Sequence, residues 1–251
     1  MKAGGAALVT GAGRGIGRAV ALELARRGFR VHATLRDPAR AGALRQAAAA
    51  EGLELAVERL DVTDADSIAL PEGLRVLVNN AGVDLANLPV EHAPLSLWRE
   101  MFETNLFGLV EVTRRAVPRL RAAGGGVICN LSSISVLSEV PFYAAYRASK
   151  AAVGALCDSL RSELAGFGIR VLEVMPGPVE TDMFAASGKR PEAAEHEGYT
   201  ELALKLWEGR RSMGPMTATA DSAARDIVDA ILDDDVRARV ACDPLSKSQL
   251  G

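Results

Sequence analysis

The chain has few of the residues that build disulfide frameworks and metal centres. Its 251 residues include three cysteines and three histidines, which are scattered and form no C-x-x-C pair. We therefore expect neither a disulfide framework nor a metal site. The sequence also lacks a run of about 18 apolar residues, and its first apolar run begins within a few residues of Met1, which leaves no room for a charged n-region and a cleavage site. No membrane span and no signal peptide are expected, which makes a cytoplasmic location the simplest expectation.

A strong excess of charge of either sign is absent as well. The formal net charge is -3, and no basic stripe is present that could follow a phosphate backbone. Nucleic acid is therefore an unlikely partner, and a small molecule is the expected one. The hydrophobic fraction of 49% and the chain length suit one globular domain over residues 1–251.

Short apolar runs alternate with stretches of helical periodicity along the whole chain. The runs expected to form strands cover residues 6–10, 29–35, 53–60, 75–82, 126–133, 169–175 and 236–241. Strands that recur with a helix between them pair in parallel through right-handed crossovers. The sequence therefore predicts an α/β fold, a single-domain doubly wound Rossmann fold with a central seven-stranded parallel sheet flanked by helices.

One segment, residues 184–216, breaks this rhythm. It is longer than an ordinary connection from strand to helix, and the stretch "TELALKLWEGR" within it predicts one helix. We expect an excursion over the carboxyl edge of the sheet. A lid over a site and a plain surface insertion are both compatible with the sequence.

The glycine-rich stretch "TGAGRGIG" (10–17) follows the first expected strand and opens the first helix. Glycine permits a tight turn and lets backbone N–H groups approach a pyrophosphate at the helix N-terminus. Gly11, Gly15 and Gly17 have G-x-x-x-G-x-G spacing and not G-x-G-x-x-G, because Ile16 stands where that pattern requires its third glycine. On this feature alone, a helix entry that merely needs glycine remains the alternative.

The end of the second expected strand, "ATLRDPAR", indicates the form of the cofactor. The ribose 2′ position lands there, and neutral Leu35 stands at the expected acidic position with Arg36 directly after it. Asp37 before Pro38 is better explained as the N-cap of the next helix. Arg14 adds a second cation, so the charges favour NADP(H) over NAD(H).

The stretch "YAAYRASK" (143–150) suggests acid–base chemistry. Tyr146 and Lys150 are four residues apart in an expected helix and therefore share one face. A nearby ammonium favours the phenolate and brings the phenol closer to a useful pKa. Tyr143 has Arg147 at the same offset, but a bulky guanidinium fork is less suited to tuning a phenol and holding a ribose hydroxyl.

These motifs together resemble the short-chain dehydrogenase/reductase family. "TGAGRGIG", "NNAG" (79–82), the asparagine of "ETNLFG", "NLSS" (130–133), "YRASK" (146–150) and "PGPVET" (176–181) occur in that family's order and approximate spacing. Within the family, residues 141–164 and the end of the second expected strand, "HATLRD", look closest to NADP-linked 17β-hydroxysteroid and retinol dehydrogenases. The resemblance spans roughly residues 5 to 240.

The resemblance implies a role for each matching residue. Tyr146 would be the general acid/base, Lys150 would bind the nicotinamide ribose, Ser133 would hold the substrate oxygen, and Asn105 would anchor a water. The implied cofactor contacts are Gly11, Arg14, Gly15, Ile16, Gly17, Arg36, Asp61, Val62, Asn79, Ala81, Gly82, Tyr146, Lys150, Pro176, Gly177, Val179 and Thr181. Ordinary turn chemistry is the alternative for the "NNAG" and "PGP" residues. The family also implies a homodimer or homotetramer.

Mostly apolar residues are expected to wall the substrate pocket. We expect Leu137, Tyr143, Met183 and Phe184 there, with Trp207 and Met213 as further candidates, although Leu137 could equally be core. Such a wall suggests a lipophilic ketone or aldehyde and its alcohol. The expected function is therefore an NADP(H)-dependent oxidoreductase. A non-catalytic dinucleotide sensor, an NAD-linked dehydrogenase, and an epimerase or dehydratase on the same fold are the alternatives.

Overall fold

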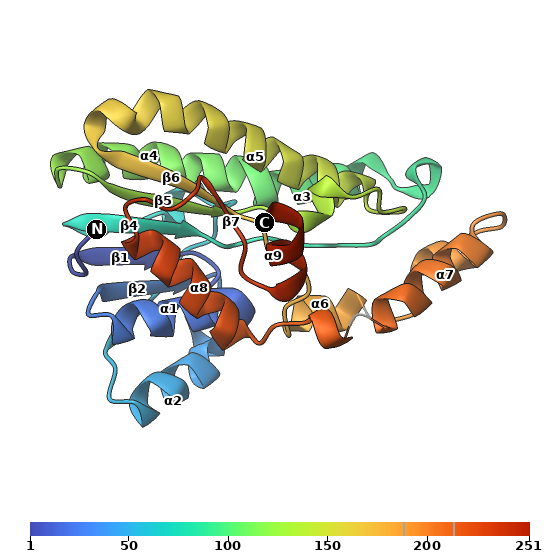
Figure 1. Cartoon of the computed structure of the whole chain (residues 1–251), viewed down its shortest axis with the longest axis horizontal. Coiled ribbons are helices and arrows are strands. Elements are labelled where there is room, and N and C mark those ends of the chain that lie inside the picture. Colours follow the sequence, from blue (N-terminus) through green and yellow to red (C-terminus); the bar gives the residue numbers. More distant parts are fainter. Residues whose placement is uncertain (188, 213) are drawn as a thin grey trace.

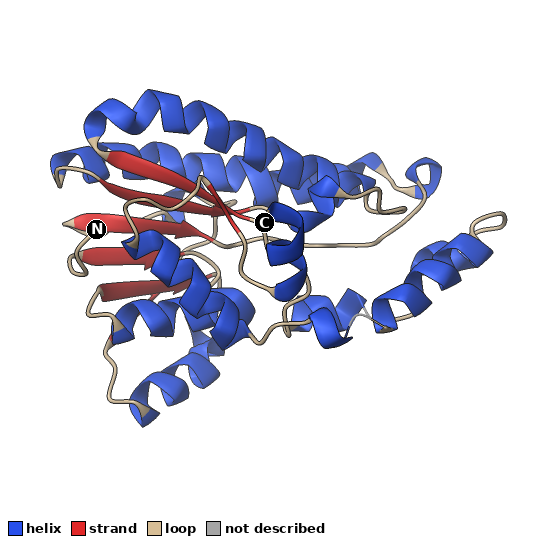
Figure 2. Cartoon of the chain, in the orientation of Figure 1, coloured by secondary structure: helices blue, strands red, loops and turns tan. Residues whose placement is uncertain are grey.

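The computed structural model describes residues 1–187, 189–212 and 214–251, and a seven-stranded parallel sheet forms its centre (Figures 1 and 2). Its strands pair in the order β3-β2-β1-β4-β5-β6-β7. They are β1 (Ala6–Val9), β2 (Arg30–Leu35), β3 (Leu55–Arg59), β4 (Leu74–Asn79), β5 (Gly126–Leu131), β6 (Ile169–Val174) and β7 (Arg239–Val240).

The predicted α/β fold and all seven strands are confirmed. The strands are mostly shorter than the apolar runs, because several runs continue into the loops that leave the sheet. "NNAG", for example, departs from the sheet after Asn79. The last strand keeps only two residues, paired with the end of β6.

Helices cover both faces of the sheet, as Figure 2 shows. They are α1 (Gly15–Arg26), α2 (Gly42–Ala50), α3 (Leu95–Phe102), α4 (Gly108–Ala122), α5 (Ala144–Leu164), α6 (Asp182–Ser187), α7 (Thr200–Arg211), α8 (Ala220–Leu232) and α9 (Pro244–Leu250). Helices α4 and α5 lie on one face of the sheet, and α1 and α8 lie on the other (Figure 1).

Each face of the sheet has its own hydrophobic core, because successive strand residues point to opposite faces. In β1, Ala7 and Val9 pack among residues of α1 and α8, whereas Leu8 packs among residues of α4 and α5. All three side chains are fully buried. Burial on both faces explains why the strands read as continuous apolar runs.

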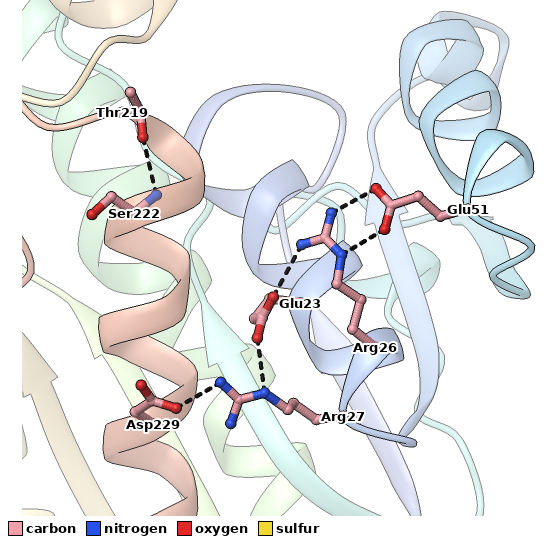
Figure 3. Close-up of polar contacts among 7 residues, drawn as sticks. All are labelled: Glu23, Arg26, Arg27, Glu51, Thr219, Ser222 and Asp229. Carbon is pink, nitrogen blue, oxygen red and sulfur yellow. Dashed lines mark hydrogen bonds and ion pairs between the residues drawn. The ribbon is translucent and has the colours of Figure 1, made fainter.

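Ion pairs join the helices that cover one face, as Figure 3 shows. The buried Glu23 carboxylate of α1 accepts hydrogen bonds from Arg26 at 3.0 Å and from Arg27 at 2.8 Å. Arg26 also donates two bonds to Glu51, which ends α2, and Arg27 donates one to Asp229 of α8. The network therefore ties α1 to both of its neighbouring helices.

The excursion contains the helix that the sequence predicts, which is α7 (Thr200–Arg211). The segment also holds α6 and a 3₁₀ turn at Glu192–Glu195, and α7 projects away from the sheet in Figure 1. In the described part of the chain, every helix is too short or too polar to cross a membrane.

Candidate active site

A cavity of about 1300 Å³ runs along the carboxyl ends of the central strands. The strand order reverses between β1 and β4, and ligands of doubly wound sheets bind in the crevice at such a point. The cavity collects residues from the glycine turn, the ends of β2, β4, β5 and β6, helix α5 and the excursion.

The glycine turn forms one end of this cavity. Gly11 and Gly15 have φ angles of 65° and 54°, a region that favours glycine, and both line the cavity. Gly17 does not line it. A Cβ on Gly17 would lie 2.3 Å from Nδ2 of Asn80 and 2.5 Å from the Gly11 carbonyl oxygen, so this glycine permits close packing. Arg14 and Ile16 both line the cavity, as expected from the sequence.

The two asparagines of "NNAG" have separate positions. Asn79 is buried and donates hydrogen bonds to Thr113 at 2.9 Å and Asn130 at 2.8 Å, and it does not line the cavity. Asn80 does line the cavity, and its Nδ2 donates to the carbonyl oxygens of Thr10 and Gly11. The structure therefore places Asn80, rather than the expected Asn79, beside the glycine turn.

Cations gather where β2 ends. Leu35 is buried, whereas Arg36 is exposed and lines the cavity. The Asp37 carboxylate accepts from the Ala39 N–H at 3.0 Å and caps the 3₁₀ turn Pro38–Ala41, so its N-cap role is confirmed. Arg18 and Arg40 also line the cavity, and the sequence reading did not single them out.

Arg14 differs from the other cations because it is already paired. Its Nη1 lies 3.2 Å from a carboxylate oxygen of Asp182 in α6, and both side chains are largely exposed. This contact links the glycine turn to the start of the excursion. An exposed pair of this kind exchanges readily with solvent and is weakly held.

Most of the other expected cofactor residues also meet in the cavity. Those that line it are Asp61, Val62, Ala81, Gly82, Pro176, Gly177, Val179 and Thr181. The loop that carries Gly177 is anchored from the C-terminal end, since the Gly177 N–H donates to the Asp243 carboxylate at 2.7 Å. Asp243 caps α9, whose Leu245 and Gln249 line the cavity and were not expected there.

Tyr146, Lys150 and Ser133 come together in the same cavity. Lys150 Nζ donates to the Leu131 carbonyl oxygen at 2.9 Å and lies 5.9 Å from the centre of the Tyr146 ring. The Ser133 Oγ accepts hydrogen bonds from the N–H and the hydroxyl of Ser135, at 3.2 and 3.0 Å.

Burial changes the acid–base properties of this group. It raises the pKa of Tyr146 above its ordinary value, and the nearby Asp84 carboxylate raises it further, whereas Ser133 acts to lower it. Burial also lowers the pKa of Lys150 to about 8. The sequence reading expected Lys150 to lower the pKa of the phenol. In the chain without cofactor, desolvation of the phenolate is instead the largest influence on this pKa, so the Tyr146 hydroxyl is protonated.

The other tyrosine, Tyr143, stands next to the phenol of Tyr146. Their rings meet edge to face with centroids 6.2 Å apart. Arg147 is directed away from the Tyr143 hydroxyl, because its Nε donates a hydrogen bond to the Ser135 carbonyl oxygen at 2.8 Å. Phe142, which precedes Tyr143, has a φ of 68°, a strained value for a bulky residue. This bend leads the chain into α5.

Asn105 lies outside the cavity, in a π-helical turn (Glu103–Phe107) between α3 and α4. Its Nδ2 donates to the Val83 carbonyl oxygen and to the Ser149 hydroxyl, at 2.9 and 3.0 Å, so both amide hydrogens are used inside the protein. Ser149 in turn donates to the Tyr146 carbonyl oxygen at 2.7 Å. Asn105 therefore positions the helix that carries Tyr146.

The wall opposite the glycine turn contains part of the expected substrate pocket. Tyr143, Met183 and Phe184 line the cavity. Leu137 is 46% exposed and does not line it, although Ile134 and Ser135 of the same 3₁₀ turn do. Trp207 does not line it either, and Met213 lies outside the described residues. Helix α7 instead contributes Leu202, Lys205, Leu206, Gly209 and Arg210.

Asp84 is a further polar residue that the sequence reading missed. It follows "NNAGV", lines the cavity, and carries a carboxylate close to Lys150, Arg210 and Tyr146. An acidic residue directly after a strand-ending turn was the available signal. Among the described residues, no group of three His, Cys, Asp or Glu side chains is arranged to hold a metal ion.

Comparison with known proteins agrees with this geometry. The short chain dehydrogenase family model matches residues 5–192. The chain is 35% identical over 230 residues to the uncharacterized oxidoreductase YusZ of Bacillus subtilis, covering 86% of this chain and 81% of that protein. It is 36% identical over 201 residues to retinol dehydrogenase 8 of Bos taurus, covering 76% and 64% of the two chains.

Solved structures of similar proteins hold a nicotinamide dinucleotide. A short chain dehydrogenase from Burkholderia cenocepacia, in complex with NADP, is 26% identical with a TM-score of 0.76, covering 98% of this chain and 91% of that one. One from Burkholderia phymatum, in complex with NAD, is 25% identical with a TM-score of 0.81, covering 99% and 92%. This chain therefore belongs to the short-chain dehydrogenase/reductase family and is an oxidoreductase of CH-OH and C=O groups with a nicotinamide dinucleotide cofactor.

Proposed function

We propose that the protein is an NADP(H)-dependent oxidoreductase that interconverts a lipophilic ketone or aldehyde and its alcohol, with Tyr146 as general acid/base. The observation that carries this proposal is the gathering of Ser133, Tyr146 and Lys150 in one cavity with the glycine turn and with Arg36. Such an arrangement suits a dinucleotide that reaches from the end of β2 to the phenol.

The backbone around the glycine turn fits the cofactor. A Cβ on Gly11 would lie 2.9 Å from Cα of Ala81, and one on Gly15 would lie 3.0 Å from a methyl group of Thr181. Only glycine leaves this passage open, and the N-terminus of α1 favours a pyrophosphate there. Gly82 would similarly hold the backbone close to Lys150 Nζ, since a Cβ there would lie 3.3 Å from it.

The bound cofactor supplies or accepts the hydride. In the direction of reduction, the neutral Tyr146 hydroxyl donates its proton to the carbonyl oxygen, and Ser133 donates a hydrogen bond to the same atom. A phenol whose pKa is raised by burial remains protonated for this role. Lys150 holds a ribose hydroxyl and supplies positive charge beside the phenol. In the direction of oxidation, the proton returns to Tyr146 from the alcohol.

The preference for NADP(H) rests on Arg36, with Arg40 as a second cation at the same end of the cavity. An NAD-linked dehydrogenase is the second candidate, and one observation favours it. Asp182 already pairs with Arg14 and reduces the positive charge that a 2′-phosphate would meet. Initial rates with NADPH and with NADH at equal concentration distinguish the two.

The experiment that tests the proposed activity is NADPH oxidation against a panel of steroid, retinoid, aliphatic and aromatic carbonyl compounds. We expect turnover of at least one apolar ketone or aldehyde. Tight NADPH binding without turnover across the panel would instead support a non-catalytic dinucleotide-binding protein.

As part of the same proposal, the protein assembles as a homodimer or homotetramer in the cytoplasm. The π-helical turn before α4 supports an association of copies, since its Phe107 is a large apolar side chain that is 55% exposed. Light scattering on the purified chain tests the oligomer, and a monomer would contradict it.

A further inference from the structure

The strongest unassigned feature is a polar corner of the cavity beside Tyr146, formed by Asp84, Tyr143 and Arg210. All three line the cavity. The guanidinium carbon of Arg210 lies 4.4 Å from the centre of the Tyr143 ring, and that ring meets Tyr146 edge to face. Residues from the loop after β4, from the start of α5 and from the excursion therefore meet at the reacting phenol.

Asp84 brings an ionised carboxylate into this corner. Burial raises the pKa of Asp84 to about 6, while Arg210, the Asn87 side chain and Lys150 act to lower it. The carboxylate is therefore charged at neutral pH, and an ionised carboxylate only accepts hydrogen bonds.

Two buried polar atoms in the corner have no hydrogen-bond partner among the described residues. They are Oδ1 of Asp84 and the hydroxyl oxygen of Tyr143, although the Arg210 and Asn87 side chains lie close enough to this hydroxyl to act on its pKa. Leaving such atoms unpaired destabilises the protein, so each one in a native structure requires an explanation. Their common place beside Tyr146 points to the substrate as the missing partner.

The chemistry of the corner selects one kind of substrate group. The ionised carboxylate of Asp84 accepts hydrogen bonds, the guanidinium of Arg210 donates them, and the Tyr143 hydroxyl can take either role. A carboxylate on the substrate would be repelled by the negative charge of Asp84. An ammonium would be repelled by the positive charges of Arg210 and Lys150. A hydroxyl group both donates and accepts, and it carries no charge.

We propose that the substrate of this enzyme carries a hydroxyl group on the carbon next to the reacting carbonyl, in addition to the oxygen that reacts. Asp84 selects such substrates by accepting a hydrogen bond from this second hydroxyl group. The inference rests on the proposed function and narrows its substrate class. The remaining wall, with Met183, Phe184, Leu202 and Leu206, suits an apolar body on the same molecule.

The reaction is then the interconversion of an α-hydroxy ketone and a vicinal diol. In reduction, the carbonyl carbon gains a hydride from NADPH, which is oxidised to NADP⁺. The carbonyl oxygen gains a proton from Tyr146, and this proton is replaced from solvent. The second hydroxyl group is held in place and is unchanged by the reaction.

The test compares kcat/KM for NADPH-dependent reduction of 2-hydroxyacetophenone and acetophenone, which differ only in that hydroxyl group. We expect the wild-type chain to prefer the hydroxy ketone by about tenfold or more, because a site built to bind a hydroxyl group discriminates against the analogue lacking it. In Asp84→Leu the ratio of the two values falls to about one. Asp84→Asn keeps part of the preference, since its amide oxygen still accepts.

Asp235→Asn is the matched control, because this exposed carboxylate lies outside the cavity and its loss leaves the ratio unchanged. Thermal unfolding of each variant separates a loss of fold from a loss of selectivity. Phenylglyoxylate and the phenacyltrimethylammonium cation complete the set, and a preference of the wild-type chain for either charged compound would overturn the inference.

The two proposals fail in different ways. Reduction of acetophenone without a preference for the hydroxy ketone, or an unchanged ratio in Asp84→Leu, overturns the role of Asp84 and leaves the proposed activity standing. Absence of turnover with all four compounds and with the wider carbonyl panel overturns the proposed activity, and this inference with it.

Discussion

The side chain of Asn105 and the backbone of Val83 form two reciprocal hydrogen bonds. Oδ1 of Asn105 accepts from the Val83 N–H at 2.8 Å, and Nδ2 donates to the Val83 carbonyl oxygen at 2.9 Å. A π-helical turn between α3 and α4 is thereby joined to the loop that follows β4, next to Asp84. The same amide reaches Ser149 on α5, so one side chain connects three segments around the active site.

We predict that Asn105→Leu removes this connection and lowers both stability and activity. The backbone groups of Val83 would be left unpaired, which costs about 2–3 kcal/mol of unfolding free energy. The loss is measured by urea denaturation together with kcat/KM. Ser149→Ala, which removes the bonds of this hydroxyl to Asn105 and to the Tyr146 carbonyl oxygen but keeps both bonds to Val83, should have a smaller effect. Equal stability of Asn105→Leu and the wild-type chain would contradict the structural role.

Tyr146→Phe should abolish turnover and leave NADPH binding nearly intact, because the substitution removes only the hydroxyl group that exchanges the proton. NADPH binding is measured by fluorescence titration, and turnover by NADPH oxidation. The matched variant is Tyr143→Phe, which removes the neighbouring hydroxyl group and should change the choice of substrate more than the rate. Retained activity in Tyr146→Phe would refute the assignment of the acid/base.

Replacement of both Arg36 and Arg40 by alanine should weaken the use of NADPH. Without these cations the 2′-phosphate loses its partners, and we expect the KM for NADPH to rise about tenfold while that for NADH changes little. Arg45→Ala is the control, since this exposed cation lies outside the cavity and donates to the Pro38 carbonyl oxygen. An equal rise for both cofactors would show that the two arginines do not read the 2′-phosphate.

The rate of reduction should fall at alkaline pH. Burial lowers the pKa of Lys150 to about 8, so its ammonium is present below that pH and lost above it. We therefore expect kcat/KM for NADPH to decrease as the pH rises through about 8, by about tenfold per unit at higher pH. The decrease should persist in Tyr143→Phe, because burial raises the pKa of Tyr143 to about 12. A rate that holds steady up to pH 10 would exclude Lys150 as the titrating group.

Glu23→Gln should destabilise the face of the sheet that α1 and α8 cover. The buried carboxylate accepts from two arginines, and its loss should lower the free energy of unfolding by about 1–3 kcal/mol. Glu51→Gln, at the exposed end of the same network, should have the smaller effect. Thermal unfolding of both variants provides the comparison, and the reverse order would contradict the importance of burial.

Local patterns in the sequence were sufficient for the fold and for the proximity of Tyr146 and Lys150. Apolar runs separated by helical stretches define a doubly wound sheet, because parallel strands need helical crossovers. Tyr146 and Lys150 are neighbours on one helix, so their spacing alone places them together. The N-cap role of Asp37 was also readable, since capping depends on adjacent residues.

The contacts between distant segments were decided only by the tertiary structure. Asp84 and Arg210 lie far apart in the chain, and no local pattern brings α7 over the loop after β4. The turn at the end of β4 likewise determines that Asn80 faces the glycine turn while Asn79 is buried among Thr113 and Asn130. The burial of Tyr146 also depends on contacts between distant segments, because the side chains that surround it and raise its pKa come from several elements. Sequence spacing carries no information about how these elements pack.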